Sequence, residues 1–495
     1  MVKSESDKHH NPPEATVTRT VNDEYDLAVI GSGGAAFAAA IKASVLGKRV
    51  AMVERGTVGG TCVNTGCVPS KALLAAAEAR HVARDAGRFP GLRAVDVPVD
   101  MPSLAAGKQD LVAGMRAEKY LDLIADYGWD LHRGTATFTG SAEDPLLNIV
   151  FPDGQQQRIR AAHYLVATGS SPWAPAVEGL EESGYLTSTT AMELAEVPES
   201  LLVIGGGFVA LEQAQLFARL GSKVTMLVRS RLASAEEPEA GEALASVFAD
   251  EGIRVVRGAV PEKITRDAEG AVSVNVTVAG GAREFTGSHL LVATGRRAVT
   301  SGLNLARVGV VLGARGEIPV DDTLATTHPR IWAAGDVTGH PEFVYVAAAH
   351  GALAVENAFT AGTRKIDYRH LPRVAFTSPA LAAVGMTDKE ASRAGITCEC
   401  RLLPLEYVPR SVVNRDTRGF IKIVAEKATG RILGITAVAK EAGDLAAAGV
   451  YILEGGMSVD QVAHLWSPYL TMAEGLKIAA QTYTTDIMRL SCCAS

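Results

Sequence analysis

The sequence predicts an α/β fold with two similar nucleotide-binding units and a different C-terminal domain. A short β-branched run that breaks into glycines and continues as an Ala-rich stretch occurs twice, at 25–36 and at 201–212. From Pro372 onward the pattern changes to short strands and helical segments without a glycine fingerprint. This second pattern is typical of an α+β domain.

The composition indicates a large globular enzyme and excludes several other classes. The chain has 495 residues, 47% of them hydrophobic, and a net charge of −7. At about 150 residues per domain, the length suggests roughly three domains, and the apolar content excludes disorder of the whole chain. The acidic balance offers no footprint for nucleic acid, and no apolar run reaches the roughly 18 residues that span a bilayer. We therefore expect a cytoplasmic protein with no nucleic-acid or membrane partner.

The first repeated unit carries a phosphate-binding glycine motif. A predicted strand leads into Gly31-x-Gly33-x-x-Ala36, and a second predicted strand ends at Glu54. Gly31 permits a tight turn, Gly33 lets a pyrophosphate approach the helix N-terminus, and Ala36 allows close helix–strand packing. Glu54, about 20 residues beyond the first glycine, is placed to bind a ribose diol. The segment therefore predicts a dinucleotide site.

The second unit repeats the motif as Gly205-x-Gly207-x-x-Ala210. After its second strand, the position where an acid would hold a free 2′-hydroxyl is Arg229, with Arg231 two residues later. Two arginines there suit a 2′-phosphate and favour NADPH over NADH; the alternative is that both are solvated surface residues. Two such units imply two nucleotides, most simply a flavin dinucleotide and a nicotinamide dinucleotide.

Strand-to-glycine corners accompany the two units. The repeated sequence Ala-Thr-Gly ends at Gly169 and again at Gly295, and a related corner precedes Asp336. The two repeated corners fit crossovers between the nucleotide domains, and Gly169 and Gly295 are candidate cofactor-binding residues there.

The six cysteines come as three close pairs. They are Cys62 and Cys67, Cys398 and Cys400, and Cys492 and Cys493. Six cysteines are too few for a disulfide framework, so their pairing points to redox or soft-metal chemistry. At i and i+2 in a predicted strand, Cys398 and Cys400 face the same side. For this pair, packing as small buried hydrophobes is favoured over a metal or redox role.

The first thiol pair lies between Gly59 and Lys71. Cys62 and Cys67 are five positions apart at a predicted helix start, where a disulfide can form if the first turn is distorted. The helix N-terminus and Lys71 would lower the thiol pKa and give a reactive thiolate. Taken alone, such a pair could also be inert core cysteines, but its place after the first nucleotide motif favours electron exchange with a flavin.

With the flanking sequences GGT and VPSK, the chain resembles the pyridine nucleotide-disulfide oxidoreductases, the family of glutathione reductase and dihydrolipoamide dehydrogenase. The resemblance runs from about Tyr25 to the C-terminus. It implies a glutathione reductase-like fold in which electrons pass from NAD(P)H through FAD to a Cys62–Cys67 disulfide. Cys67 would be the charge-transfer thiolate and Cys62 the interchange thiol.

The resemblance also implies which residues line FAD, and it pairs Lys71 with Glu212 near the flavin N5. The residues lining FAD would be Ala36, Glu54, Gly56, Thr61, Lys71, Ala136, Asp336 and Val344.

The C-terminal domain departs from the thiol reductases of that family. Those proteins resemble one another in a His-Pro-x-x-x-Glu motif, whose histidine protonates the leaving thiolate. Here the segment Tyr469-Leu-Thr-Met-Ala-Glu474 keeps the glutamate but has a tyrosine at the histidine position. A phenol with a pKa of about 10 is a poor acid–base group at neutral pH. This argues against lipoamide or glutathione as the substrate.

The chain ends in a second candidate metal ligand, the adjacent pair Cys492-Cys493. Neighbouring cysteines rarely form a relaxed disulfide with each other, but two exposed thiolates can chelate a soft metal. The alternative is a chance pair of oxidisable thiols. Together with the flavin dithiol and the Tyr469 segment, this tail resembles the members of the family that reduce Hg(II).

That closer resemblance implies a role for each group. Hg(II) would arrive as a thiol complex, be captured by Cys492 and Cys493, and pass to Cys62 and Cys67 by ligand exchange. In the family the tail acts in the partner subunit's site, which implies a homodimer built on residues beyond about Pro372. Two tyrosines would flank the bound Hg(II); these are Tyr120 and Tyr469.

The predicted function is NADPH-dependent reduction of Hg(II) to elemental mercury, a detoxification reaction. The alternatives are a dihydrolipoamide dehydrogenase-like or glutathione reductase-like disulfide reductase, a metal-binding redox sensor, and a flavoprotein oxidase that passes electrons to O₂. The predicted domains are a flexible leader over 1–24, a discontinuous FAD-binding domain over 25–173 and 297–371, an NADPH-binding domain over 174–296, and a dimerisation domain with the tail over 372–495.

Overall fold

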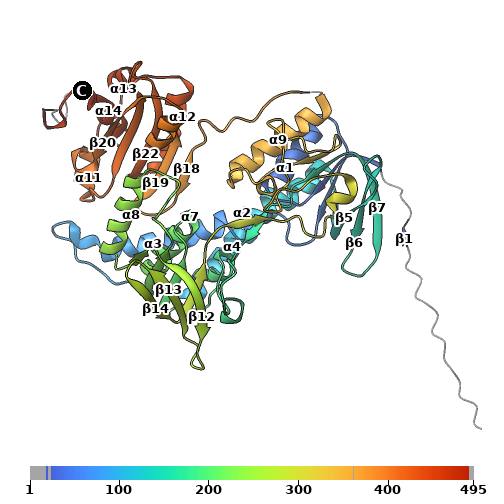
Figure 1. The fold of residues 1–495 in the computed structure, drawn as a ribbon, viewed down its shortest axis with the longest axis horizontal. Helices are drawn as coiled ribbons and strands as arrows, with labels where there is room; N and C mark the ends of the chain where they lie inside the picture. Colours follow the sequence, from blue (N-terminus) through green and yellow to red (C-terminus); the bar gives the residue numbers. More distant parts are fainter. Residues whose placement is uncertain (1–17, 20–23, 361, 490–495) are drawn as a thin grey trace, which may run out of the picture. The chain divides into compact units, whose positions relative to one another are not determined.

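The computed structural model describes residues 18–19, 24–360 and 362–489 (Figure 1). The chain divides into two compact units, one formed by residues up to 60 with 116–170 and 297–366, the other by 61–115, 171–296 and residues from 367 onward. Apart from 18–19 and 24, the predicted leader lies outside the described residues. The Cys492–Cys493 tail lies outside them as well.

The first unit is built on an eight-stranded sheet. Its order is β4-β3-β2-β7-β6-β5, and β1 and β17 also pair with β7. Strands β2, β3, β4, β7 and β17 run parallel, so their carboxyl ends meet at one edge of the sheet. The strands are β1 (Thr18–Arg19), β2 (Glu24–Ile30), β3 (Val50–Glu54), β4 (Asp130–Arg133), β5 (Thr135–Gly140), β6 (Pro145–Val150), β7 (Gln156–Val166) and β17 (Ile331–Ala333).

Two long helices of this unit, α1 (Gly34–Val45) and α9 (Val344–Thr360), pack side by side (Figure 1). Small residues allow the close approach, since a Cβ on Gly351 would lie 2.0 Å from the carbonyl oxygen of Ala35. Many alanines of the two helices pack in the hydrophobic core against this sheet. The remaining helical segments are η2 (Ala117–Leu121), α5 (Asp122–Tyr127), η4 (Leu305–Val308) and η5 (Asp336–Thr338).

The second unit contains the repeated nucleotide motif. Four parallel strands in the order β11-β10-β9-β15 form its main sheet, and β12, β13 and β14 form a separate antiparallel sheet. The strands are β9 (Ser200–Ile204), β10 (Lys223–Val228), β11 (Arg254–Arg257), β12 (Val260–Arg266), β13 (Val272–Val278), β14 (Gly281–Gly287) and β15 (His289–Val292). The helices are α3 (Cys67–Arg84), η1 (Ala86–Arg88), α4 (Met101–Arg116), η3 (Glu181–Ser183), α6 (Ser188–Ala191), α7 (Phe208–Leu220) and α8 (Pro238–Asp250).

Three short elements lie where the chain passes from one unit to the other. They are α2 (Gly60–Asn64), β8 (Ser170–Pro172) and β16 (Arg296–Ala298).

The C-terminal part of the second unit is an antiparallel sheet in the order β18-β19-β22-β21-β20 with helices around it (Figure 1). Its strands are β18 (Arg373–Ala375), β19 (Ala380–Gly385), β20 (Cys398–Pro404), β21 (Phe420–Glu426) and β22 (Ile432–Ala439). Its helices are α10 (Asp388–Arg393), η6 (Leu405–Tyr407), α11 (Pro409–Asn414), α12 (Ala442–Glu454), α13 (Val459–His464), α14 (Glu474–Gln481) and η7 (Ile487–Arg489). Two sheets, one mixed and one parallel, that each carry a glycine motif after a parallel strand, followed by this α+β part, confirm the predicted fold class.

Candidate functional site

The turn after β2 requires glycine for steric reasons. Gly31 has a φ of +104°, and a Cβ there would lie 2.4 Å from the carbonyl oxygen of Ala167. Gly33 is the N-cap residue of α1. A Cβ on Gly60 would lie 2.5 Å from the Cα of Gly33. Ala36 is fully buried in the first turn of α1. The helix therefore begins beside bare backbone, which is the arrangement that admits a pyrophosphate.

A pocket that is open to solvent adjoins this turn. Glu54 lines it, and its carboxylate accepts hydrogen bonds from Ser32 Oγ at 2.6 Å and from the Gly56 N–H at 2.7 Å. These bonds orient the carboxylate at the place predicted to bind a ribose. The cavity is lined by Ile30, Gly31, Val53, Glu54, Arg55, Gly134, Thr135, Ala136, Thr168, Val299, Ser301, Gly302 and Leu303.

Most of these wall residues were missed by the sequence reasoning. The segments 134–136 and 299–303 come from distant parts of the chain, and only Ala136 was predicted among them. A glycine motif marks where the phosphates bind, but nothing in it indicates which later strands complete the wall around a base and a ribose.

The other residues predicted to line FAD in this unit lie at the ends of elements. Asp336 is the first residue of η5 and accepts a 2.7 Å hydrogen bond from Ser170 Oγ. Val344 begins α9, and Gly169 has a φ of +67° in the corner after β7. Their contact with FAD stays a prediction.

The first thiol pair lies at a break between two helices. Cys62 is in α2, and Cys67 is the first residue of α3; both are half-buried thiols. The carbonyl of Thr61 accepts a hydrogen bond from the Thr65 N–H at 2.9 Å, and a Cβ on Gly66 would lie 3.0 Å from the same oxygen. Gly66, with a φ of −127° and a ψ of −106°, then interrupts the helical path between the two cysteines; a disulfide between them stays a prediction.

The two thiols of this pair differ in acidity. Cys62 donates a hydrogen bond to the Cys67 sulfur, and this bond, with the positive charge of Lys71, lowers the pKa of Cys67 to about 7 against the opposing effect of burial. The same hydrogen bond, together with burial, raises the pKa of Cys62. In the reduced pair at neutral pH, the negative charge is therefore held on Cys67.

Lys71 and Glu212 form an ion pair in the same unit. Lys71 lies one turn beyond Cys67, and its Nζ is 2.7 Å from Glu212 Oε2. The other carboxylate oxygen of Glu212 accepts the Phe376 N–H at 2.9 Å, and Lys71 lies over the Phe376 ring. Glu212 is almost fully buried in α7. The pair joins the dithiol helix to the second nucleotide motif; its placement near a flavin stays a prediction.

The second motif requires glycine for the same steric reason as the first. Gly205 has a φ of +139°, and a Cβ there would lie 2.3 Å from the carbonyl oxygen of Ala293. A Cβ on Gly207, which caps α7, would meet no atom within 4 Å, so the helix N-terminus faces open space. Ala210 is buried, and Gly295 closes the corner after β15 with a φ of +132°.

The two arginines after β10 have different environments. Arg229 is exposed at the end of the strand. The terminal nitrogens of Arg231 instead donate to four backbone carbonyls of the loop that follows; these belong to Ala233, Ser234, Glu236 and Glu237. Arg231 therefore shapes the loop, while Arg229 is the more exposed of the two. The sequence alone could not distinguish these roles, because an arginine at either position could bind a phosphate.

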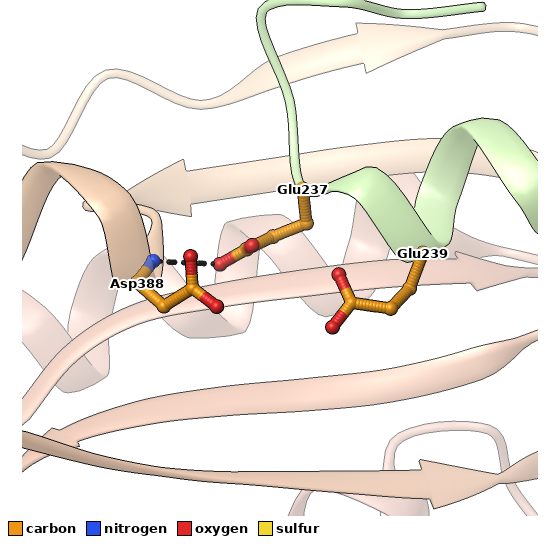
Figure 2. Close-up of side chains that lie close together, drawn as sticks. All are labelled: Glu237, Glu239 and Asp388. Atoms are coloured by element: carbon orange, nitrogen blue, oxygen red, sulfur yellow. Dashed lines mark hydrogen bonds between the residues drawn. The ribbon is translucent and has the colours of Figure 1, made fainter. Parts of the chain in front are cut away.

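The same loop ends in buried carboxylates that the sequence reasoning did not single out. Glu236 makes a bidentate ion pair with Arg373 at 2.8 Å. Glu237, Glu239 and Asp388 converge from α8 and α10, and the Asp388 N–H donates to Glu237 (Figure 2).

Lys422 supplies the positive charge for this cluster. Its Nζ lies 2.9, 2.8 and 3.0 Å from the carboxylates of Glu237, Glu239 and Asp388. Burial raises the pKa of Glu237, and the three carboxylates raise the pKa of Lys422 despite its burial. An ammonium group already occupies the position where a cation would bind, so the cluster is a structural clamp between α8 and the C-terminal sheet.

The groups predicted to handle Hg(II) beyond the first thiol pair are only partly described. Tyr120 lies in η2 and packs edge-on against Phe37, with ring centroids 4.7 Å apart. Tyr469 is half exposed and precedes Leu470, whose N–H donates to Glu474. Tyr120 and Tyr469 belong to different units, and the cysteines of the tail lie outside the described residues. Their joint action on a metal stays a prediction.

Among the described residues, every helix is too short or too polar to cross a bilayer.

Comparison with protein families identifies the class of protein. A model of the pyridine nucleotide-disulphide oxidoreductases matches residues 25–351, and a model of the dimerisation domain of the same family matches residues 371–480. The chain therefore belongs to the pyridine nucleotide-disulphide oxidoreductases. Solved structures agree: the HOCl-induced flavoprotein disulfide reductase RclA from Escherichia coli, as its Cu(II) complex, has a TM-score of 0.83 and 27% identity over 93% of this chain and 100% of that chain. LpdA from Mycobacterium tuberculosis has a TM-score of 0.82 and 27% identity, with the same coverage.

Curated relatives place the chain within that family. The mercuric reductase of Streptomyces lividans is 57% identical over 95% of this chain and 98% of its own length. Those of Bacillus cereus and Staphylococcus aureus are 46% and 43% identical, over 96% and 99% of this chain and 74% and 88% of theirs. Within its family, the chain belongs with the mercuric reductases.

Proposed function

We propose that the chain is a cytoplasmic, homodimeric, FAD-containing enzyme that uses NADPH to reduce Hg(II) to elemental mercury. The observation that carries this proposal is the Cys62–Cys67 pair, whose thiolate is held on Cys67 by Cys62 and Lys71. A pair of sulfur ligands with one of them already ionised at neutral pH is suited both to accept electrons as a disulfide and to bind a soft cation.

Two features of the chain fit the two nucleotides. The cavity beside Gly31 and Glu54 suits the adenosine end of FAD, with the pyrophosphate at the start of α1. The open N-terminus of α7 and the exposed Arg229 suit the pyrophosphate and the 2′-phosphate of NADPH. When bound, FAD supplies the carrier that passes two electrons from the nicotinamide to the sulfur atoms.

The dithiol would take its substrate by ligand exchange. The Cys67 thiolate displaces one thiolate from an Hg(II)–thiol complex, and Cys62 then gives its proton to the second departing thiolate as it binds the metal. Two electrons reduce the bound Hg(II) to Hg(0), and both sulfur atoms are left as thiolates. The raised pKa of Cys62 means that this residue regains a proton first.

The tail and the two tyrosines complete the proposal. Cys492 and Cys493 would capture Hg(II) and deliver it to the dithiol of the partner subunit, and Tyr120 and Tyr469 would flank the metal there. Large apolar side chains left exposed on the C-terminal part favour a homodimer. Among the described residues these include Trp466, which is fully exposed, and Tyr451, Leu465 and Met488.

The second candidate is a dihydrolipoamide dehydrogenase-like or glutathione reductase-like disulfide reductase. The same dithiol could serve it, but a half-exposed phenol at 469 replaces the imidazole that such chemistry needs. If this alternative were right, the chain would reduce a small disulfide with NADPH, and Tyr469→His would raise that activity from an already substantial level.

The test is anaerobic oxidation of NADPH by the holoenzyme with Hg(II) and excess small thiol. Consumption of one NADPH per Hg(II), with release of volatile mercury, is expected, and a Cys492→Ala/Cys493→Ala variant should lose activity when thiol is in excess. NADPH consumption that ignores Hg(II) and follows an added disulfide would overturn the proposal. In a parallel aerobic assay, slow NADPH consumption that ignores Hg(II) and yields peroxide would instead favour a flavoprotein oxidase.

A further inference from the structure

The pair Cys398–Cys400 lies on β20, the edge strand of the C-terminal sheet. The register pairs Cys400 with Val424 of β21, and the two cysteine side chains, two positions apart, leave the strand on the same face. Both thiols are half-buried against α10, in a small apolar cluster that also contains Met386. The chain therefore has a second set of sulfur ligands at a sheet edge, on a strand that carries none of the residues assigned to the reaction.

The two sulfur atoms contact each other. Cys400 Sγ lies 3.8 Å from Cys398 Sγ, and Cys398 Sγ lies 4.0 Å from the carbonyl oxygen of Asp388. The side chains thus turn toward one another, which the spacing of the sequence alone did not require. The sequence favoured a packing role for this pair. Burial of two small side chains does not by itself require their sulfur atoms to contact each other.

Strand geometry separates the two chemistries open to such a pair. Extended residues two positions apart have Cα atoms about 6.8 Å apart, at the far limit of what a disulfide spans. A metal ion joins sulfur atoms that lie farther apart than those of a disulfide. With metal–sulfur bonds of about 2.3 Å, the two sulfur atoms are about 3.8 Å apart at a tetrahedral angle and about 4.6 Å apart in a linear complex. From the observed 3.8 Å, the sulfur atoms need to separate by about 0.8 Å to reach the spacing of a linear two-sulfur complex, but would have to approach by nearly 2 Å to form a disulfide bond of about 2.05 Å.

We propose that Cys398 and Cys400 form an accessory site that chelates one thiophilic metal ion, Hg(II), per chain. Sulfur ligands select soft cations over hard ones. The site requires no electron transfer, so it stands or falls independently of the proposed reductase activity.

Binding is a ligand exchange that balances without an oxidant. Two bonds from Hg(II) to small thiols break, two bonds to Cys398 and Cys400 form, and the two protein protons pass to the departing thiolates; no atom changes oxidation state. Burial and the hydrogen bond to Cys398 raise the pKa of Cys400 to about 12. Metal binding must therefore release this proton, so the affinity of the pair for the metal rises with pH.

The experiment isolates this pair by removing the other four cysteines. A variant with Cys62, Cys67, Cys492 and Cys493 all changed to Ala, loaded with FAD, is equilibrated with Hg(II) and an excess of a small monothiol, then separated and analysed for mercury. One Hg(II) retained per chain is expected. The matched controls add either Cys398→Ser or Cys400→Ser to the same background, and each should retain at least tenfold less because chelation is lost.

Equal retention by the four-alanine variant and by its single-cysteine controls would overturn the proposal. A second measurement covers the case in which the four-alanine variant does not fold. In the holoenzyme with all its other cysteines in place, Cys398→Ser and Cys400→Ser should each lower the number of Hg(II) ions retained by about one per chain. No change in that number, or a loss in only one of the two variants, would contradict a two-sulfur site.

Discussion

The chain places two thiol pairs in different electrostatic surroundings, each with a lysine nearby. At Cys62–Cys67 the pKa of one thiol falls to about 7; at Cys398–Cys400 the pKa of one thiol rises to about 12. The chemical groups are the same, so the difference comes from what surrounds them.

Three features separate the two thiols. Cys67 accepts a hydrogen bond from the Cys62 thiol, whereas Cys400 donates one to Cys398. Cys67 begins a long helix, whose N-terminal N–H groups stabilise a thiolate, whereas Cys400 lies in a strand, which has little net dipole. Lys71 is paired with one carboxylate, whereas Lys422 is shared among three. The three carboxylates therefore offset most of the positive charge of Lys422, and little of it is left to lower the pKa of Cys400. A lysine near a thiol predicts reactivity only when its own ion pairs are counted.

The largest difference should appear in turnover. Cys67→Ala should lower NADPH-dependent Hg(II) reduction by about a thousandfold or more, because the group that both carries electrons and binds metal is removed. Cys398→Ser/Cys400→Ser should leave kcat within about twofold, since that pair is not part of the proposed reaction. A comparable loss in both variants would show that the two pairs do not act separately.

The two lysines should differ in what they stabilise. Lys422→Met removes a nearly buried cation from three carboxylates and leaves Glu237 buried and unpaired. Unfolding in urea should show a loss of about 3–5 kcal/mol. The control Lys223→Met breaks an exposed pair with Glu199 and should cost less than about 0.5 kcal/mol. Equal losses would mean that the cluster in Figure 2 is not a structural clamp.

Lys71→Met should act on acidity instead. It removes the cation that lowers the pKa of Cys67 and leaves Glu212 to raise it, so the pKa of Cys67 should rise by about one unit. Thiolate absorbance at 240 nm in the reduced enzyme, followed against pH, measures this shift. Lys71→Arg keeps the charge and should leave the profile close to that of the parent protein. An unmoved midpoint in Lys71→Met would remove the lysine from the explanation.

Glu212→Gln should give the smallest effect, and in the opposite direction. The negative charge of Glu212 raises the pKa of Cys67, so its removal should lower that pKa by less than about half a unit. The same absorbance profile would then move toward acid. Movement toward alkali would indicate that Glu212 acts on Cys67 mainly by positioning Lys71.

The sequence predicted the parts of the site that local rules determine. Gly31 and Gly205 have the positive φ that their turns require, and Glu54 lines the cavity beside the first motif. The use of Arg231 by four loop carbonyls could not be predicted, because it depends on how the loop after β10 closes. The contact between the sulfur atoms of Cys398 and Cys400 depends on side-chain rotation, which a spacing of two does not determine.

Alkylation of the reduced holoenzyme across pH, read separately for each cysteine by peptide mass spectrometry, tests the central comparison most directly. Because a thiol reacts as its thiolate, labelling of Cys67 should rise through a midpoint near pH 7, while Cys400 should stay largely unlabelled up to about pH 10. If both cysteines were labelled along one curve centred near the ordinary thiol value of about 9, the two environments would not differ as described.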